Sequence, residues 1–146
     1  MKKDIVLYPN ERIDDLQFAN LHIIQSKDDF RFSMDSVLIS DFATLQNRMK
    51  ICDLGTGTGI IPLLLYGRNN TVTCDAVEIL PSAAERAARS MVLNGVSEHI
   101  AVHCADLRQI RSFLPHGQYA LVTSNPPYAV TGAAIPSPKP SFQSAR

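Results

Sequence analysis

Several features that would mark a particular class of protein are missing from this sequence. Fourteen lysine and arginine residues balance fourteen acidic ones among 146, so net charge gives no argument for a nucleic-acid partner, although a local patch can hide in a neutral total. No apolar run approaches the roughly 20 residues that a membrane span needs. Acidic residues and Pro9 stand where a signal peptide would have its apolar core, so we expect a cytoplasmic protein without a membrane partner.

Cysteine is scarce as well. Cys52, Cys74 and Cys104 lie far apart in apolar segments, and none belongs to a CxxC pair. Buried, reduced thiols in strands explain them better than zinc or redox roles, and the four histidines show no ligand spacing, so no metal site is predicted. Arg86 and Arg89, three residues apart in a predicted helix, are expected to form a solvated face.

What the sequence does contain is a regular alternation of short apolar strands and helices from residue 49 onward. Four strands and three helices are predicted, in the chain order 49–55, 60–68, 72–79, 81–95, 100–106, 107–114 and 119–124. This alternation is typical of a doubly wound, Rossmann-like α/β fold, in which both faces of a parallel sheet are covered. Ligands bind such sheets at the carboxyl ends of the strands.

The part of the chain before residue 49 is less regular. Segments 21–26 and 30–33 flank a Lys-Asp-Asp sequence and predict a short hairpin. A helix is expected through 36–46, with Ser33 or Asp35 as its cap. The apolar residues of this helix fall roughly on one face: Val37, Leu38, Phe42 and Leu45.

The first predicted strand ends in Asp53 and the glycine-rich turn Gly-Thr-Gly-Thr-Gly. Gly55, Gly57 and Gly59 allow a sharp turn and leave no Cβ in the way of a ligand, while the next helix directs its free N–H groups there. The GxGxG spacing differs from the GxGxxG of dinucleotide enzymes. The Asp53 carboxylate suits a ligand with a positive amino group better than a pyrophosphate. A purely structural turn is the alternative.

The second and third strands also end in acids. Glu78 lies 19 residues after Gly59, which is close to the spacing of an acid that binds ribose hydroxyls. Its two oxygens suit a vicinal diol, and a solvated loop acid is the alternative. Asp106 could accept a hydrogen bond from the exocyclic amine of an adenine, or cap the following helix, or do both.

The fourth strand runs directly into Asn-Pro-Pro-Tyr. Asn125 is held extended because a proline follows it, and Pro126 and Pro127 fix the backbone. The Asn125 side-chain oxygen and a backbone carbonyl, that of Pro126, then form two preset acceptors that match the hydrogens of an –NH2 group. Tyr128 offers a flat face on which a planar ring can stack. An ordinary Asn-Pro turn is the alternative.

Taken together, Asp-Leu-Gly-Thr-Gly-Thr-Gly, the acids at Glu78 and Asp106, and Asn-Pro-Pro-Tyr resemble the class I S-adenosylmethionine-dependent methyltransferases that modify an exocyclic or amide nitrogen. The resemblance covers residues from about 30 to 128. Residues 21–43 are similar to bacterial enzymes that methylate N6 of the adenine beside the anticodon of valine tRNA. In that group the region resembling 32–36 lines the methionine end of the cofactor, so the resemblance implies Asp35 and Ser36 as cofactor neighbours.

The resemblance implies a mechanism that depends on orientation. The amino lone pair of adenine is delocalised into the ring, and hydrogen bonds to Asn125 and the Pro126 carbonyl would localise it and aim it at the cofactor methyl group. The family further implies a tRNA substrate whose target base is unstacked. Two other enzymes share the motif, a protein-glutamine N5 methyltransferase and a ribosomal-RNA guanine N2 methyltransferase. A non-catalytic cofactor-binding fragment is the alternative from a different class, and a nicotinamide-dependent oxidoreductase is disfavoured.

The family pattern continues further than this sequence does. A sheet of this class carries three more strands, so the chain resembles a truncated enzyme that retains the cofactor half. We expect an N-terminal segment with the start of a hairpin (1–30), a cofactor-binding core (31–128) and a flexible, truncated substrate loop (129–146). The fourth strand would then leave a sheet edge exposed, which predicts marginal stability, weak cofactor binding and self-association.

Overall fold

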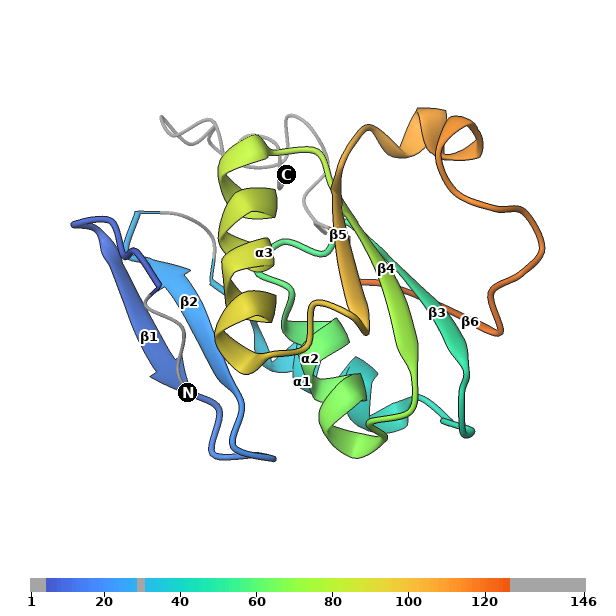
Figure 1. The fold of residues 1–146 in the computed structure, drawn as a ribbon, viewed down its shortest axis with the longest axis horizontal. Coiled ribbons are helices and arrows are strands. Elements are labelled where there is room, and N and C mark those ends of the chain that lie inside the picture. Colours follow the sequence, from blue (N-terminus) through green and yellow to red (C-terminus); the bar gives the residue numbers. More distant parts are fainter. Residues whose placement is uncertain (1–4, 29–30, 127–146) are drawn as a thin grey trace.

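A computed structural model describes residues 5–28 and 31–126 of the chain (Figure 1). Its elements are, in order, β1 (Glu11–Asp15), β2 (His22–Ser26), α1 (Met34–Phe42), β3 (Lys50–Leu54), α2 (Ile60–Arg68), β4 (Thr73–Glu78), α3 (Pro81–Asn94), β5 (Ile100–Cys104), the 3-10 helix η1 (Leu107–Ser112) and β6 (Leu121–Ser124). In this described part of the chain, every helix is too short or too polar to cross a membrane.

The central sheet is parallel and has the strand order β5-β4-β3-β6. The chain moves outward from β3 through α2 to β4 and through α3 to β5, and then returns past β3 to β6. The predicted α/β fold and all four of its strands are therefore confirmed. Strands are added on one side of β3 up to β5 and on its other side at β6. The carboxyl ends of the neighbours β3 and β6 are therefore the topological switch point of the sheet.

Successive residues of a strand point to opposite faces of the sheet, and the two faces are covered differently. Ile51 belongs to the main core, together with the apolar residues of α2 and Met91 of α3. Cys52, one residue later, packs in a smaller core with Phe113 and Leu114, which follow η1. Figure 1 shows η1 on the far side of the sheet from α3. The helix predicted at 107–114 is a 3-10 helix and ends at Ser112.

Two helices form as their sequences predict. The α2 segment is apolar nearly all round and is buried along Ile60–Leu63 and at Leu65. Proline occupies the first position of α3, where its missing N–H costs nothing, and Gly95 ends that helix with φ of 69°.

The structure contains an N-terminal hairpin, but the strand predicted to pair with residues 21–26 was wrong. β2 pairs antiparallel with β1, from Glu11 opposite Ser26 to Asp15 opposite His22, whereas residues 31–33 form no strand. The polar Glu-Arg-Ile-Asp-Asp sequence of β1 carries no alternating pattern that would have predicted it. Figure 1 shows the hairpin beside α3, where Ser90 Oγ accepts a hydrogen bond from the Ile24 amide at 3.0 Å.

Buried ion pairs join the hairpin to α3, so the solvated face expected for Arg86 and Arg89 was wrong. The Glu11 side chain is 1% exposed and accepts from Arg86 Nε at 3.1 Å and Arg89 Nη2 at 2.6 Å. The hydrogen bonds from Arg89 are the largest cause that lowers the pKa of Glu11 to about 2, against the effect of burial. Arg89 also stacks over the Tyr8 ring, 4.7 Å from its centroid.

Helix α1 differs from its prediction in extent and in the face it buries. Ser33 is the N-cap residue and makes no side-chain cap bond, while Asp35 lies in the first turn, so the Asp35 cap was wrong. Ser36 and Ser40 are buried, whereas Leu38 and Phe42 are 59% and 92% exposed.

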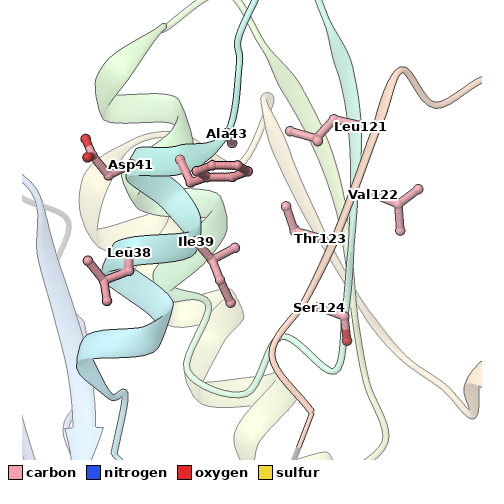
Figure 2. Close-up of a pocket in the computed structure, with 9 residues that line it drawn as sticks. Leu38, Ile39, Asp41, Ala43, Leu121, Val122, Thr123 and Ser124 are labelled. Atoms are coloured by element: carbon pink, nitrogen blue, oxygen red, sulfur yellow. The ribbon is translucent and has the colours of Figure 1, made fainter.

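A shallow apolar groove separates α1 from β6, which is one of the two edge strands of the sheet in the described part of the chain (Figure 2). In the figure Ile39 points from α1 toward β6, whereas Val122 points away to the other face. The groove is lined by Leu38, Ile39, Asp41, Phe42, Ala43, Leu121, Val122, Thr123 and Ser124.

The cysteines are all free thiols. Cys52 and Cys74 are buried in strands as expected, and burial raises the pKa of Cys52 to about 11. Cys104, at the end of β5, is exposed, which corrects the expectation for that residue.

Candidate active site

Four strand ends place the predicted site residues along one edge of the sheet. Asp106 follows β5, Glu78 ends β4, the glycine turn 55–59 follows β3 and Asn125 follows β6. Because adjacent strands lie about 4.8 Å apart, this row spans about 15 Å from Asp106 to Asn125. The row therefore has an order that the sequence alone could not fix, with Asn125 next to the glycine turn and Asp106 at the far end.

The three glycines of the turn serve two different purposes. All three have positive φ, of 68°, 56° and 80° in turn. Among the described residues, a Cβ on Gly55 or Gly57 would meet no atom within 4 Å, so the outer face of these glycines borders open space there. A Cβ on Gly59 would lie 2.6 Å from Met91 Cε, because Gly59 lets α2 begin in close contact with α3. Gly55 and Gly57 thus form the surface available to a ligand, and Gly59 supports it.

Asp53 is buried beneath the turn with incomplete hydrogen bonding. Thr123 Oγ1 donates to Asp53 Oδ1 at 2.6 Å, across the β3–β6 pair. Burial raises the pKa of Asp53 to about 6, with the negative charge of Glu78 acting in the same direction. Within the described residues, Asp53 Oδ2 and Thr56 Oγ1 are buried without a hydrogen-bond partner. Thr56 nevertheless lowers the pKa of Asp53 as a hydrogen-bond donor would, so the two side chains lie close to each other.

Glu78 holds the glycine turn in place. Its Oε2 accepts from the Gly57 amide at 2.8 Å, and its Oε1 accepts from the Leu80 amide at 2.9 Å. The Thr56 amide donates to the Val77 carbonyl beside it. Sequence reasoning missed this structural role. Each carboxylate oxygen still has a second lone pair, so the contacts leave room for the predicted ribose hydrogen bonds.

Asp106 caps η1, which confirms one of its two predicted roles. Its Oδ1 accepts from the Arg108 amide at 2.9 Å. The Arg108 guanidinium also binds the carboxylate, with Nη2 2.5 Å from Oδ2, and its hydrogen bonds lower the pKa of Asp106. The predicted adenine contact at Asp106 stays a prediction.

Asn125 contacts the N-terminal part of α1. Its Nδ2 donates to Ser36 Oγ at 3.0 Å, so two predicted site residues 89 positions apart are in direct contact. Asp35, the neighbour of Ser36, is exposed. Pro126 is the last residue before the undescribed segment, and Tyr128 lies outside the described residues.

Comparisons with solved structures show which class of fold this is. The chain superposes on TrmN from Thermus thermophilus with a TM-score of 0.56 and 23% identity, over 64% of this chain and 28% of that one. It superposes on a precorrin-6y C5,15-methyltransferase from Geobacter metallireducens with a TM-score of 0.58 and 14% identity, over 70% and 52% of the two chains. The fold is that of the class I methyltransferases.

Sequence comparison identifies the family. The family described as the methyltransferase small domain matches residues 15–137, and the chain belongs to it. A curated relative from Musicola paradisiaca, named tRNA1(Val) (adenine(37)-N6)-methyltransferase, is 33% identical over 132 residues, which are 90% of this chain and 53% of the relative. A protein of the same name from Tolumonas auensis is 34% identical, over 82% and 49% of the two. The chain spans about half the length of these relatives.

Proposed function

We propose that this chain carries the cofactor-binding half of an S-adenosylmethionine-dependent methyltransferase that acts on N6 of an adenine in tRNA, in valine tRNA beside the anticodon. The observation that carries the proposal is the position of Asn125, fixed at the switch point next to the glycine turn. The names of three relatives that are 32–34% identical support the tRNA substrate.

The order of the residues along the sheet edge fits S-adenosylmethionine bound in one orientation. The adenine would lie at Asp106, the ribose at Glu78 and the methionine part over Gly55 and Gly57, where open space borders the turn. The unpartnered Asp53 Oδ2 lies beneath this position and suits a positively charged amino group. When bound, the cofactor supplies an electrophilic methyl group. Asp35 and Ser36 remain proposed neighbours of its methionine end.

The chain itself would contribute to methyl transfer by orienting the target amino group. The Asn125 side-chain oxygen and the Pro126 carbonyl would each accept one hydrogen of the target amino group and hold its lone pair toward the glycine turn. Ser36 Oγ accepts from Asn125 Nδ2 at 3.0 Å, a contact that helps to hold the amide group in one orientation. Tyr128 would stack on the target base. No strongly perturbed general base is required, because the amino group can lose its proton after transfer.

The proposed function agrees with the three segments predicted from the sequence. We propose residues 1–30 as an N-terminal segment, 31–128 as the cofactor-binding core and 129–146 as part of a substrate loop. Residues 127–146 lie outside the described part of the chain.

The proposal is tested by following a labelled methyl group. The chain is incubated with labelled S-adenosylmethionine and, in parallel, tRNA, ribosomal RNA or release factor, and each incubation is repeated with Asn125→Ala. We expect label at N6 of adenine in tRNA that is lost in the variant. Label in release factor or in ribosomal-RNA guanine would support one of the other two enzymes. Cofactor binding without any transfer would indicate a non-catalytic fragment.

A further inference from the structure

The carboxylate of Asp106 is already occupied by a side chain of the same loop. Arg108 Nε lies 2.9 Å from Asp106 Oδ2, and Nη2 lies 2.5 Å from the same oxygen. The Arg108 side chain is 87% exposed, whereas that of Asp106 is 22% exposed. The guanidinium is therefore the more exposed partner of an ion pair at the end of β5, where the adenine is proposed to bind.

The ion pair is separate from the helix cap. The cap uses the backbone amide of residue 108, which donates to Asp106 Oδ1 and is present whatever side chain follows. The guanidinium adds a second contact to the same carboxylate, and η1 does not need it in order to begin at Leu107. This second contact can therefore be lost without loss of the local fold.

An amino group arriving at Asp106 must compete with this guanidinium. A carboxylate oxygen that accepts from two arginine nitrogens has little remaining capacity for a further donor from the same direction. Exposed ion pairs contribute little to stability, so Arg108 can be displaced at small cost. Displacement would nevertheless reduce the net affinity for any ligand whose amino group binds there.

We propose that Arg108 is an internal competitor for the adenine-recognition carboxylate, so that a purine nucleoside with a 6-amino group must displace its guanidinium from Asp106 to bind. The inference rests on the proposed function, since it takes the adenine of the cofactor as the ligand at Asp106. It assigns to Arg108 a specificity role. Ligands that cannot donate to Asp106 gain nothing from displacing the arginine.

The test is the affinity of the chain for S-adenosylhomocysteine, measured by titration calorimetry for the wild type, Arg108→Ala and Arg108→Gln. We expect both variants to bind about two- to five-fold more tightly, the range that corresponds to an exposed ion pair. Arg111→Ala is the matched control, because Arg111 lies in the same 3-10 helix and has the same charge. Its affinity should equal that of the wild type.

A second ligand shows whether the effect passes through the amino group. S-inosylhomocysteine has a 6-oxo group in place of the 6-amino group, so removing Arg108 should give no gain in its affinity. Equal affinities of the wild type and both Arg108 variants for S-adenosylhomocysteine, or weaker binding by the variants, would overturn the inference while leaving the proposed function intact. Failure of the wild type and all variants to bind S-adenosylhomocysteine would refute the proposed cofactor and the inference with it.

Discussion

Asn125 Nδ2 donates a hydrogen bond to Ser36 Oγ at 3.0 Å and so connects the end of β6 to the first turn of α1. Ser36 is 5% exposed, and its backbone carbonyl accepts from Ser40 Oγ at 2.7 Å. The Asn125 amide is thereby oriented by a residue of a different element, independently of the prolines that follow it.

Replacing Ser36 should therefore impair transfer more than cofactor binding. In Ser36→Ala the Asn125 amide loses an acceptor that orients it, and we expect the methyl-transfer rate to fall about 10- to 100-fold, with a smaller fall in S-adenosylhomocysteine affinity. Ser40→Ala is the control, because it removes a buried hydroxyl of the same helix whose hydrogen bond goes to the Ser36 carbonyl. A loss of cofactor affinity as large as the loss of rate would show that Ser36 acts through the cofactor alone and does not orient Asn125.

The buried acid beneath the glycine turn should make stability depend on pH. Because the pKa of Asp53 is raised from 3.8 to about 6, the folded chain holds a proton there that the unfolded chain releases. The contribution of Asp53 to the free energy of unfolding is then most favourable below about pH 4. It falls by about 3 kcal/mol as pH rises to about 6. Urea unfolding of Asp53→Asn should lack this decline and show a more stable protein at pH 7. An unchanged pH profile in the variant would contradict the assignment.

The ion pairs between the hairpin and α3 should give the opposite pH dependence. The pKa of Glu11 is lowered from 4.5 to about 2, so its contribution is present above about pH 4.5 and disappears as pH falls toward 2. We expect Glu11→Gln to reduce the free energy of unfolding by about 3 kcal/mol at pH 7. Hydrogen exchange at the Ile24 amide, which bonds Ser90, should quicken as the hairpin loosens.

Glu85→Gln is the matched control for this prediction. Glu85 pairs with the same Arg89, but its side chain is 47% exposed, so we expect a change below about 1 kcal/mol. Similar losses in Glu11→Gln and Glu85→Gln would show that burial is not what makes the Glu11 contacts strong.

The glycines of the turn should separate binding from stability. In Gly57→Ala the new methyl group borders open space, so the cost to folding is about 1–2 kcal/mol from the positive φ alone, while S-adenosylhomocysteine affinity should fall sharply. In Gly59→Ala the Cβ also meets Met91, and we expect a loss of about 2–4 kcal/mol. Thermal unfolding and calorimetry on both variants check this. Tight binding by Gly57→Ala would place the ligand elsewhere.

The exposed edge of β6 should promote self-association. Val122 on this strand and Phe42 on α1 are 55% and 92% exposed. We expect sedimentation velocity to show concentration-dependent oligomers, and Val122→Lys or Phe42→Glu to shift them toward monomer. Ile13→Lys, on the hairpin, controls for added charge. A compact monomer at every concentration would contradict this prediction.

The strand ends were predictable from sequence because their signals are local. A glycine turn, an acid at a set spacing or an Asn-Pro pair is read within a few residues, and the order of elements then places each at the same edge of the sheet. The hairpin partner and the burial of Arg86 were not predictable in this way, because Glu11 reaches Arg86 across 75 positions. The contacts of Asn125 with Ser36 and of Asp53 with Thr123 likewise depend on how distant segments pack.

The row of four strand ends also bears on how such a protein can change its specificity. Each part of the ligand would be recognised by a loop that follows its own strand, and the strands beneath share one rigid hydrogen-bonded frame. A new methyl acceptor could thus arise by exchanging the loop after β6, with no retuning at β5 or β4. Diversification of acceptors with retention of one methyl donor is the evolutionary outcome that this layout favours.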